Sequence, residues 1–228
     1  MRSVTRFAPF LLAAALGCGD DAQPPSAPDL DATPAVETAA QLSFRQISAG
    51  GGSSGDLHTC GVTTDDRAYC WGANLWGQLG VGSNSGPDDC GNPCSKRPVA
   101  VQGGLRFRHV SAGDRFTCGI TTDDRAYCWG RNVEGQLGDG TETIRFRPVP
   151  VAGGRRFRQV RAGASHTCAI TPADVAFCWG SGALGDGAIA QHSTPVRVAG
   201  GLRWRLLSVD LHTCGVTTDD RAYCWGVN

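Results

Sequence analysis

The segment TCGITTDDRAYCWG, residues 117–130, decides the fold of this chain because close copies of it return along the sequence. Each copy ends in Cys-Trp-Gly, and the copies begin their cysteine pattern at Cys60, Cys118, Cys168 and Cys214. A phrase that returns roughly every fifty residues is typical of a repeat protein built from similar structural units. The unequal intervals favour a β-rich unit with loops of varying length over a helical solenoid of fixed step.

Each copy has the pattern of a β-hairpin, with two strand-like runs around a polar turn. In the first copy the turn formers are residues 64–66, Thr-Asp-Asp. A turn of this length places Cys60 opposite Cys70 on one face and Thr59 opposite Trp71 on the other. Both faces are largely apolar, so we expect each hairpin to lie in a sheet that is covered on both sides.

Two further strands complete each unit. Residues 157–163 alternate in polarity before a hairpin, and residues 147–151, Arg-Pro-Val-Pro-Val, indicate an edge strand because proline cannot donate to a central ladder. Four strands per unit form a β-propeller blade. The predicted fold is all-β, a propeller of four-stranded antiparallel blades within residues 43–228. The predicted blades are residues 44–104, 105–154, 155–201 and an incomplete 202–228.

The amino terminus is typical of an export signal, which we place at residues 1–17. Arg2 and Arg6 precede an apolar run that is too short to span a bilayer. The sequence Ala-Leu-Gly-Cys at residues 15–18 resembles the lipobox of bacterial lipoproteins, which implies lipidation of Cys18. Secretion with cleavage nearby and no lipid remains the alternative.

Residues 18–42 are predicted to form a disordered tether. They are rich in Pro, Ala and Asp and too poor in apolar side chains to order themselves. The expected location is therefore the bacterial cell envelope, lipid-anchored at the outer membrane or the cell surface, or else the secreted fraction. The membrane is contacted through the lipid anchor only.

The chain contains 11 Cys, and all except Cys18 fall into local pairs. Even numbers at regular spacing in an exported protein indicate disulfides. The predicted disulfides are Cys60 with Cys70, Cys90 with Cys94, Cys118 with Cys128, Cys168 with Cys178, and Cys214 with Cys224. A metal site of thiols and carboxylates is the alternative for the loop around Cys90, and the lack of a nearby His favours the disulfide.

Residues 128–140, CWGRNVEGQLGDG, resemble the repeat of the regulator of chromosome condensation family, whose members build seven-bladed β-propellers. The resemblance covers residues 44–228. Residues 71–80 retain this sequence motif, and residues 179–187 carry a shortened form of it. Cysteines at both hairpin positions are typical of exported bacterial members of the family. The resemblance implies a β-propeller scaffold.

About 3.75 blades do not close a seven-bladed ring. We expect an open arc or part of a seven-bladed ring, with the chain a fragment of a longer propeller. The alternatives are a homodimer that completes one ring and a four-bladed closure. Residues 56–72 and 210–226 are identical, which is typical of recent duplication.

No catalytic motif stands out. Paired acids at residues 65–66, 123–124 and 219–220 lie at separate hairpin tips, whereas a general acid and base must converge on one substrate. His58, His166 and His212 share a repeat position held by Phe116 in the second copy, which indicates packing. A net charge of +0 gives no electrostatic case for nucleic-acid binding. We therefore predict no enzymatic activity, no cofactor and no metal.

Trp76 has no counterpart in the other copies. Together with Asn74 and Leu75 it is the candidate contact site. The predicted function is a non-catalytic, extracytoplasmic scaffold that binds a protein or glycan partner. The alternatives are guanine-nucleotide exchange by family analogy, for which no residue here can be matched, and a gene fragment without independent function.

Overall fold

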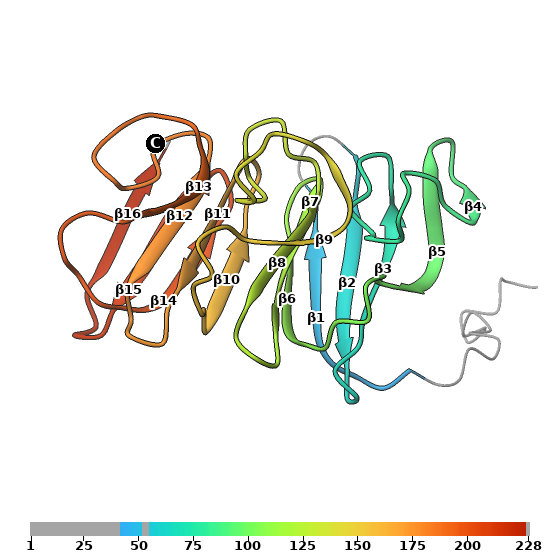
Figure 1. Cartoon of the computed structure of the whole chain (residues 1–228), viewed down its shortest axis with the longest axis horizontal. Coiled ribbons are helices and arrows are strands. Elements are labelled where there is room, and N and C mark those ends of the chain that lie inside the picture. The colour runs from blue at the N-terminus through green and yellow to red at the C-terminus, as the bar shows by residue number, and fades with distance from the viewer. Residues whose placement is uncertain (1–41, 52–54, 227–228) are drawn as a thin grey trace, which may run out of the picture. The chain divides into compact units, whose positions relative to one another are not determined.

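The structure is a computed structural model that describes residues 42–51 and 55–226. The predicted signal peptide, Cys18 and nearly all of the predicted tether lie outside these residues. Every regular element described is a β-strand, and the strands form four antiparallel sheets that follow one another in chain order (Figure 1). The prediction of an all-β fold built from antiparallel blades is confirmed. Within the same residues there is no helix of the length and apolarity needed to cross a membrane.

We number the four sheets as blades one to four. Blade one comprises β1 (Phe44–Gly50), β2 (His58–Thr63), β3 (Ala68–Ala73), β5 (Pro93–Ala100) and β4 (Asp88–Asp89), in that spatial order. Blade two comprises β6 (Phe107–Ala112), β7 (Phe116–Thr121), β8 (Ala126–Gly130) and β9 (Arg145–Pro150). Blade three comprises β10 (Gln159–Ala162), β11 (His166–Ile170), β12 (Ala176–Gly180) and β13 (His192–Arg197). Blade four comprises β14 (Trp204–Val209), β15 (His212–Thr217) and β16 (Ala222–Gly226).

Blade one differs from the four-strand prediction. Blade one has a fifth, two-residue strand, β4, because the insertion around Cys90 folds back and pairs Asp88 with Cys94. Blade four has three strands within the described residues, as predicted for the incomplete unit 202–228. Blades two and three each have the four strands that the sequence predicts.

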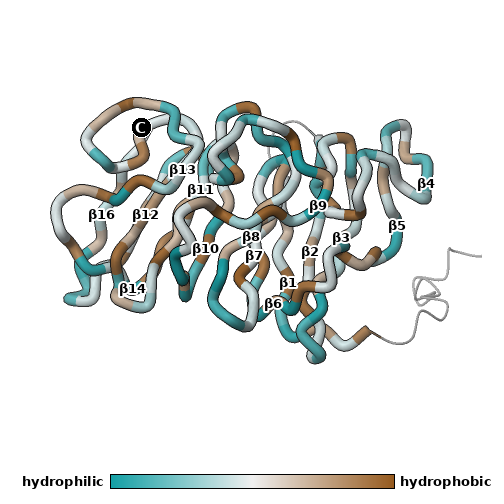
Figure 2. Tube along the Cα trace, viewed as in Figure 1, coloured by the Kyte–Doolittle hydropathy of each residue, from teal (hydrophilic) through white to brown (hydrophobic). Residues whose placement is uncertain are grey.

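The hairpin register is confirmed. Cys60 lies opposite Cys70 and Thr59 opposite Trp71 in the ladder between β2 and β3. The turn closes through a hydrogen bond from the Thr63 amide to the Arg67 carbonyl at 2.9 Å. The third turn residue, Asp66, has a φ of 65°, the left-handed conformation that Asp tolerates better than most residues. Hydrophilic residues gather at the hairpin turns, and hydrophobic residues line many of the strands (Figure 2).

The apolar core lies between neighbouring blades. Trp129 and Trp179 have 0% exposure, and each packs in a cluster with the cysteines or apolar side chains of the preceding blade. The Trp129 indole Nε1 also donates to the Gln78 carbonyl of blade one at 2.9 Å. These two repeated tryptophans are therefore packing residues between blades.

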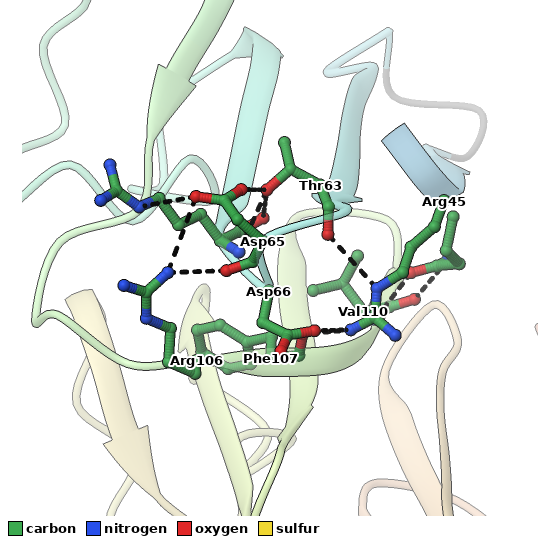
Figure 3. A network of polar contacts seen from close by, with 9 residues as sticks. Arg45, Thr63, Asp65, Asp66, Arg106, Phe107 and Val110 are labelled. Atoms are coloured by element: carbon green, nitrogen blue, oxygen red, sulfur yellow. Dashed lines mark hydrogen bonds and ion pairs between the residues drawn. The ribbon is translucent and has the colours of Figure 1, made fainter. Parts of the chain in front are cut away.

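An arginine clasp joins each blade to the next at the hairpin tips. In blade one, Arg45 donates both to the carboxylate of Asp66 and to the Phe107 carbonyl of blade two, the latter at 2.9 Å (Figure 3). Arg108 repeats the arrangement, with Asp124 at 2.8 Å and the Phe157 carbonyl at 2.9 Å. The second acid of each tip therefore has a structural partner in its own blade.

Candidate functional site

The loop after β3 is held rigidly by buried polar side chains. Asn74 has 0% exposure, and its amide Nδ2 donates to the Ser83 and Ser85 carbonyls while its Oδ1 accepts from the Leu79 amide. Gly77, with a φ of 78°, packs so closely on Phe146 that a Cβ there would clash with the ring. The loop is thereby fixed against blade two, with little freedom of its own.

Of the three predicted contact residues, the structure exposes two. Leu75 is 39% exposed and Trp76 is half-buried, whereas Asn74 faces the interior of its loop. Asn74 therefore fixes the conformation of the loop, whereas the side chains of Leu75 and Trp76 are the ones accessible to solvent. Asn132 makes the equivalent bonds in blade two, so the internal repeat was a sequence signal for this structural role.

Two arginines of blade two lie over the Trp76 ring. The guanidinium carbons of Arg115 and Arg131 are each 5.5 Å from the ring centroid, within the range of a cation–π contact. Arg115 comes from the turn before β7 and Arg131 directly follows β8. Trp76 thus links blade one to blade two, and sequence reasoning missed both arginines because the contact joins different repeats.

Acidic side chains hold the two guanidiniums in place. Arg131 is bonded to both carboxylate oxygens of Glu134 at 2.5 Å, and the Arg115 Nε lies 2.9 Å from Asp56 Oδ2. These pairs balance the two positive charges locally. The site is therefore a preorganised aromatic and guanidinium surface close to charge neutrality, not a strongly basic patch.

Exposed apolar side chains extend this surface. Leu57, next to Asp56, is 59% exposed. We call the set formed by Asp56, Leu57, Leu75, Trp76, Arg115 and Arg131 the Trp76 surface. A pocket of about 420 Å³ adjoins it, lined by Asp56 and Leu57 together with Trp71, Lys96 and the Cys90–Cys94 loop.

The structure brings all ten predicted disulfide cysteines together in the expected pairs. The four hairpin disulfides join residues whose Cα atoms are 4.0–4.1 Å apart, directly across the ladder. The Cys90–Cys94 disulfide closes the inserted loop beside β4, with a Cα separation of 6.1 Å. That disulfide fixes one wall of the pocket next to the Trp76 surface.

Two of the repeated histidines lie between blades. His58 Nε2 is 2.8 Å from Thr117 Oγ1, and His166 Nε2 is 2.8 Å from Thr213 Oγ1. Burial lowers the pKa of each imidazole to about 4, so both rings are neutral at pH 7. In the part of the chain that is described, no three His, Cys, Asp or Glu residues are grouped so as to hold a metal ion.

Two family models match the chain, both described as the regulator of chromosome condensation (RCC1) repeat. One matches residues 65–120 and 123–170, and the other matches residues 44–78 and 107–136. Together they cover more than half of the chain. The chain belongs to the RCC1 repeat family.

Two curated relatives match about two fifths of the chain. The Ultraviolet-B receptor UVR8 of Arabidopsis thaliana is 37% identical over 93 residues, which cover 41% of this chain and 20% of UVR8. The probable E3 ubiquitin-protein ligase HERC4 of Homo sapiens is 33% identical over 92 residues, 40% of this chain and 8% of HERC4. The match spans a fifth or less of each of these two relatives.

Solved structures share the fold. Human WBSCR16 superposes with a TM-score of 0.69 at 18% identity, covering 83% of this chain and 49% of WBSCR16. Prp20p of Saccharomyces cerevisiae superposes with a TM-score of 0.60 at 20% identity, covering 73% of this chain and 42% of Prp20p. At these identities the likeness concerns the fold alone, and it supports a partial β-propeller.

Proposed function

We propose that this protein is a non-catalytic scaffold that binds a protein partner through the Trp76 surface. The observation that carries the proposal is the half-buried Trp76 ring, held between blades by two arginines. The exposed Leu75 precedes Trp76 in the chain, and the exposed Leu57 follows Asp56, which pairs with Arg115. Aromatic and arginine side chains fixed beside apolar neighbours are the residues that dominate binding energy in protein interfaces. Rigid loops also reduce the entropy lost on association.

A protein partner fits this surface better than a glycan. A sugar ring binds by stacking on an open aromatic face, and here the two guanidiniums compete for the Trp76 ring. Related proteins of this fold are described as protein binders: the Prp20p structure is reported with binding to Gsp1p and histones. That description concerns Prp20p, and for this chain it supports only the choice of a protein as the class of ligand.

The proposed location is outside the cytoplasm, with lipidation at Cys18. The amino-terminal pattern supports export, and the five disulfides suit an oxidising compartment. Expression of the full chain with labelled palmitate tests the anchor. We expect label in the wild type and none in Cys18→Ala; equal labelling of both would contradict it.

The binding proposal is tested by comparing the wild type with Trp76→Glu in affinity purification from the native host, followed by measurement of the affinity for the captured protein. Glu134 holds the same loop position in blade two, so the substituted loop is expected to keep its conformation. We expect the Trp76→Glu variant to lose at least about tenfold in affinity. Tyr223→Ala, at a 38% exposed aromatic of blade four, is the matched control.

Unchanged affinity in Trp76→Glu would overturn the proposal. Guanine-nucleotide exchange, the alternative suggested by family analogy, predicts faster release of labelled nucleotide from a small GTPase. We expect a flat trace, since the Trp76 surface offers binding contacts and no residue of this chain can be matched to that activity.

We also propose that a second copy of this chain pairs with the first. Blade four exposes Ala222 and Cys224, whereas the same hairpin positions of blade one are covered by blade two. The half-buried Trp71 of blade one corresponds to the Trp129 with which blade two covers blade one. The Trp71 face of blade one is therefore equivalent to the kind of face that covers Ala68 and Cys70 in blade one. It could cover the equivalent residues Ala222 and Cys224 of blade four in a second copy.

Sedimentation velocity of the full chain tests this pairing. We expect a dimer in the wild type and a monomer in Ala222→Asp, which places a charge on the exposed face. Arg221→Ala, at the neighbouring exposed position, should remain dimeric. A wild type that stays monomeric across concentrations would contradict the pairing and would indicate that another repeat or partner covers blade four.

A further inference from the structure

Blade three carries an open pocket of about 510 Å³ beside its hairpin tip. Eight residues line this pocket, and six of them differ from the residues that the other blades carry at the same repeat positions. The six are Arg155, Pro172, Ala173, Val175, Phe177 and Arg197. Blade three also differs in the shortened motif at residues 179–187, which does not line the pocket. Six differences among eight lining residues indicate that the pocket has a function of its own.

Two of the differences bring in positive charge. Arg155 stands where the other blades have leucines, Leu105 in blade two and Leu202 in blade four. Arg197, on β13, stands where blade one has Ala100 and blade two has Pro150. Arg156 lines the same pocket, and all three arginines are exposed.

Two other differences remove the charge pair that the tip carries elsewhere. In blade one, Arg67 Nε lies 3.1 Å from Asp65 Oδ2 at the hairpin tip. Blades two and four have the same pair, with separations of 3.1 and 3.2 Å. In blade three, Ala173 and Val175 occupy these positions, so the pocket has neither this carboxylate nor its arginine.

The remaining carboxylate of the blade-three tip, that of Asp174, is already hydrogen-bonded to an arginine outside the pocket lining. Asp174 accepts hydrogen bonds from Arg158 at 2.7 and 3.0 Å as part of the clasp onto blade four. Among the described residues, no acid lies in an ion pair with Arg155 or Arg197. Arg156 donates to the Asp123 carbonyl at the tip of blade two, and its charge contributes to the lowered pKa of the Asp123 carboxyl group. The pocket therefore combines three guanidinium groups with no carboxylate among its lining residues.

The wall of the pocket is apolar and aromatic. The Arg155 guanidinium carbon lies 4.6 Å from the centroid of the Phe177 ring, a cation–π distance that orders both side chains. Phe177 replaces the Tyr of the other blades, and Pro172 replaces a Thr, so two hydroxyl groups are absent here. The wall is suited to an apolar or aromatic body, while the arginines are suited to an oxyanion.

We propose that this pocket binds a phosphate monoester carried on an apolar body. Arginine matches the geometry of phosphate through paired N–H donors. A phosphate monoester carries a charge of about −1.5 to −2 at neutral pH, which suits three guanidiniums better than the single charge of a carboxylate or a sulfate ester. The site is distinct from the Trp76 surface, because the hairpin tips and the loop after β3 lie at opposite ends of the strands.

Isothermal titration of the folded full chain with phenyl phosphate, phenyl sulfate, benzoate and inorganic phosphate tests the proposal. We expect phenyl phosphate to bind most tightly, about tenfold more tightly than inorganic phosphate, which lacks the apolar body. The double variant Arg155→Leu/Arg197→Ala should weaken phenyl phosphate binding by at least about tenfold. It restores residues found in the other blades, so its folding should be preserved, as circular dichroism would verify.

The matched control is Arg125→Ala/Arg221→Ala, which removes two exposed arginines from the tips of blades two and four. Its affinity for phenyl phosphate should equal that of the wild type. Three results would overturn the proposal: no binding of phenyl phosphate, equal binding of inorganic phosphate, or equal weakening in both double variants. Tighter binding of phenyl sulfate or benzoate would overturn the assignment to a phosphate monoester.

Discussion

Residues 56–72 of blade one and residues 210–226 of blade four have the same sequence, but several equivalent residues differ in exposure. His58 is 2% exposed and Cys70 is 0% exposed, whereas His212 and Cys224 are both exposed. The order reverses at one position of the other face, where Thr213 is 0% exposed and its counterpart Thr59 is half-buried.

The reversal follows from which neighbour each hairpin has. Blade two covers the His58 face of blade one, and blade three covers the Thr213 face of blade four through the His166 hydrogen bond. In a repeat protein the stabilisation of one unit comes largely from the interface with its neighbour. The two hairpins are therefore a matched pair in which the sequence is constant and only the contacts vary.

The largest expected difference between the two hairpins concerns the disulfides. Cys60→Ala/Cys70→Ala should lower the free energy of unfolding by about 3–5 kcal/mol, because it removes a chain constraint and leaves a cavity between blades. Cys214→Ala/Cys224→Ala should cost about 2–3 kcal/mol, since the loss of the constraint is the main effect. Urea denaturation under non-reducing conditions measures the loss of stability in both variants. Equal losses would contradict the expected difference between the two hairpins.

The second expected difference concerns pH. Burial lowers the pKa of His58 from 6.5 to about 4, an effect that Asp114 partly offsets, and the pKa of His166 is lowered to about the same value. The unfolded chain therefore binds protons that the folded chain does not as the pH falls from 6.5 to 4. The contribution of each buried neutral imidazole to the free energy of unfolding is fully present above pH 6.5. It is lost as the pH falls to about 4, by on the order of 1–3 kcal/mol per ring.

His58→Phe/His166→Phe tests this effect, since Phe116 already holds the position in blade two. We expect this variant to lose less stability than the wild type between pH 7 and pH 4 in thermal melts. His212→Phe keeps both buried imidazoles and should retain the steep loss. If all three proteins responded alike to pH, the histidines between blades would not be its source.

The smallest expected difference concerns the arginine clasps. Arg158 bonds to Asp174 and, at 2.7 Å, to the Trp204 carbonyl of blade four, whereas Arg205 is paired with Asp220 in its own blade, with both side chains more than half exposed. Arg158→Ala should lower the free energy of unfolding by about 1–2 kcal/mol, and Arg205→Ala by less than about 0.5 kcal/mol. Denaturant titration measures the free energy of unfolding of both variants. A larger loss in Arg205→Ala than in Arg158→Ala would contradict a stabilising role for the clasp between blades.

The sequence predicted the hairpins well because their signals are local. Turn formers, alternating polarity and paired cysteines act within a few residues, so the pairing of Cys60 with Cys70 could be derived before any tertiary contact was known. The role of Asn74 and the clasp of Arg45 were missed. Their partners lie in a loop and in the next blade, and the only sequence signal was the recurrence of Asn and of Phe-Arg or Trp-Arg at fixed repeat positions.

By itself, the sequence determined the repeat unit, its antiparallel strands, its hairpin register and its membership of the RCC1 repeat family, since each depends on local residue patterns. Only the tertiary structure decided which face of each identical hairpin is buried, which arginines lie over Trp76, and that six of the differences in blade three line one pocket. The physical reason is that burial, cation–π contacts and pocket walls arise between segments distant in the chain. Identical residues acquire different surroundings there.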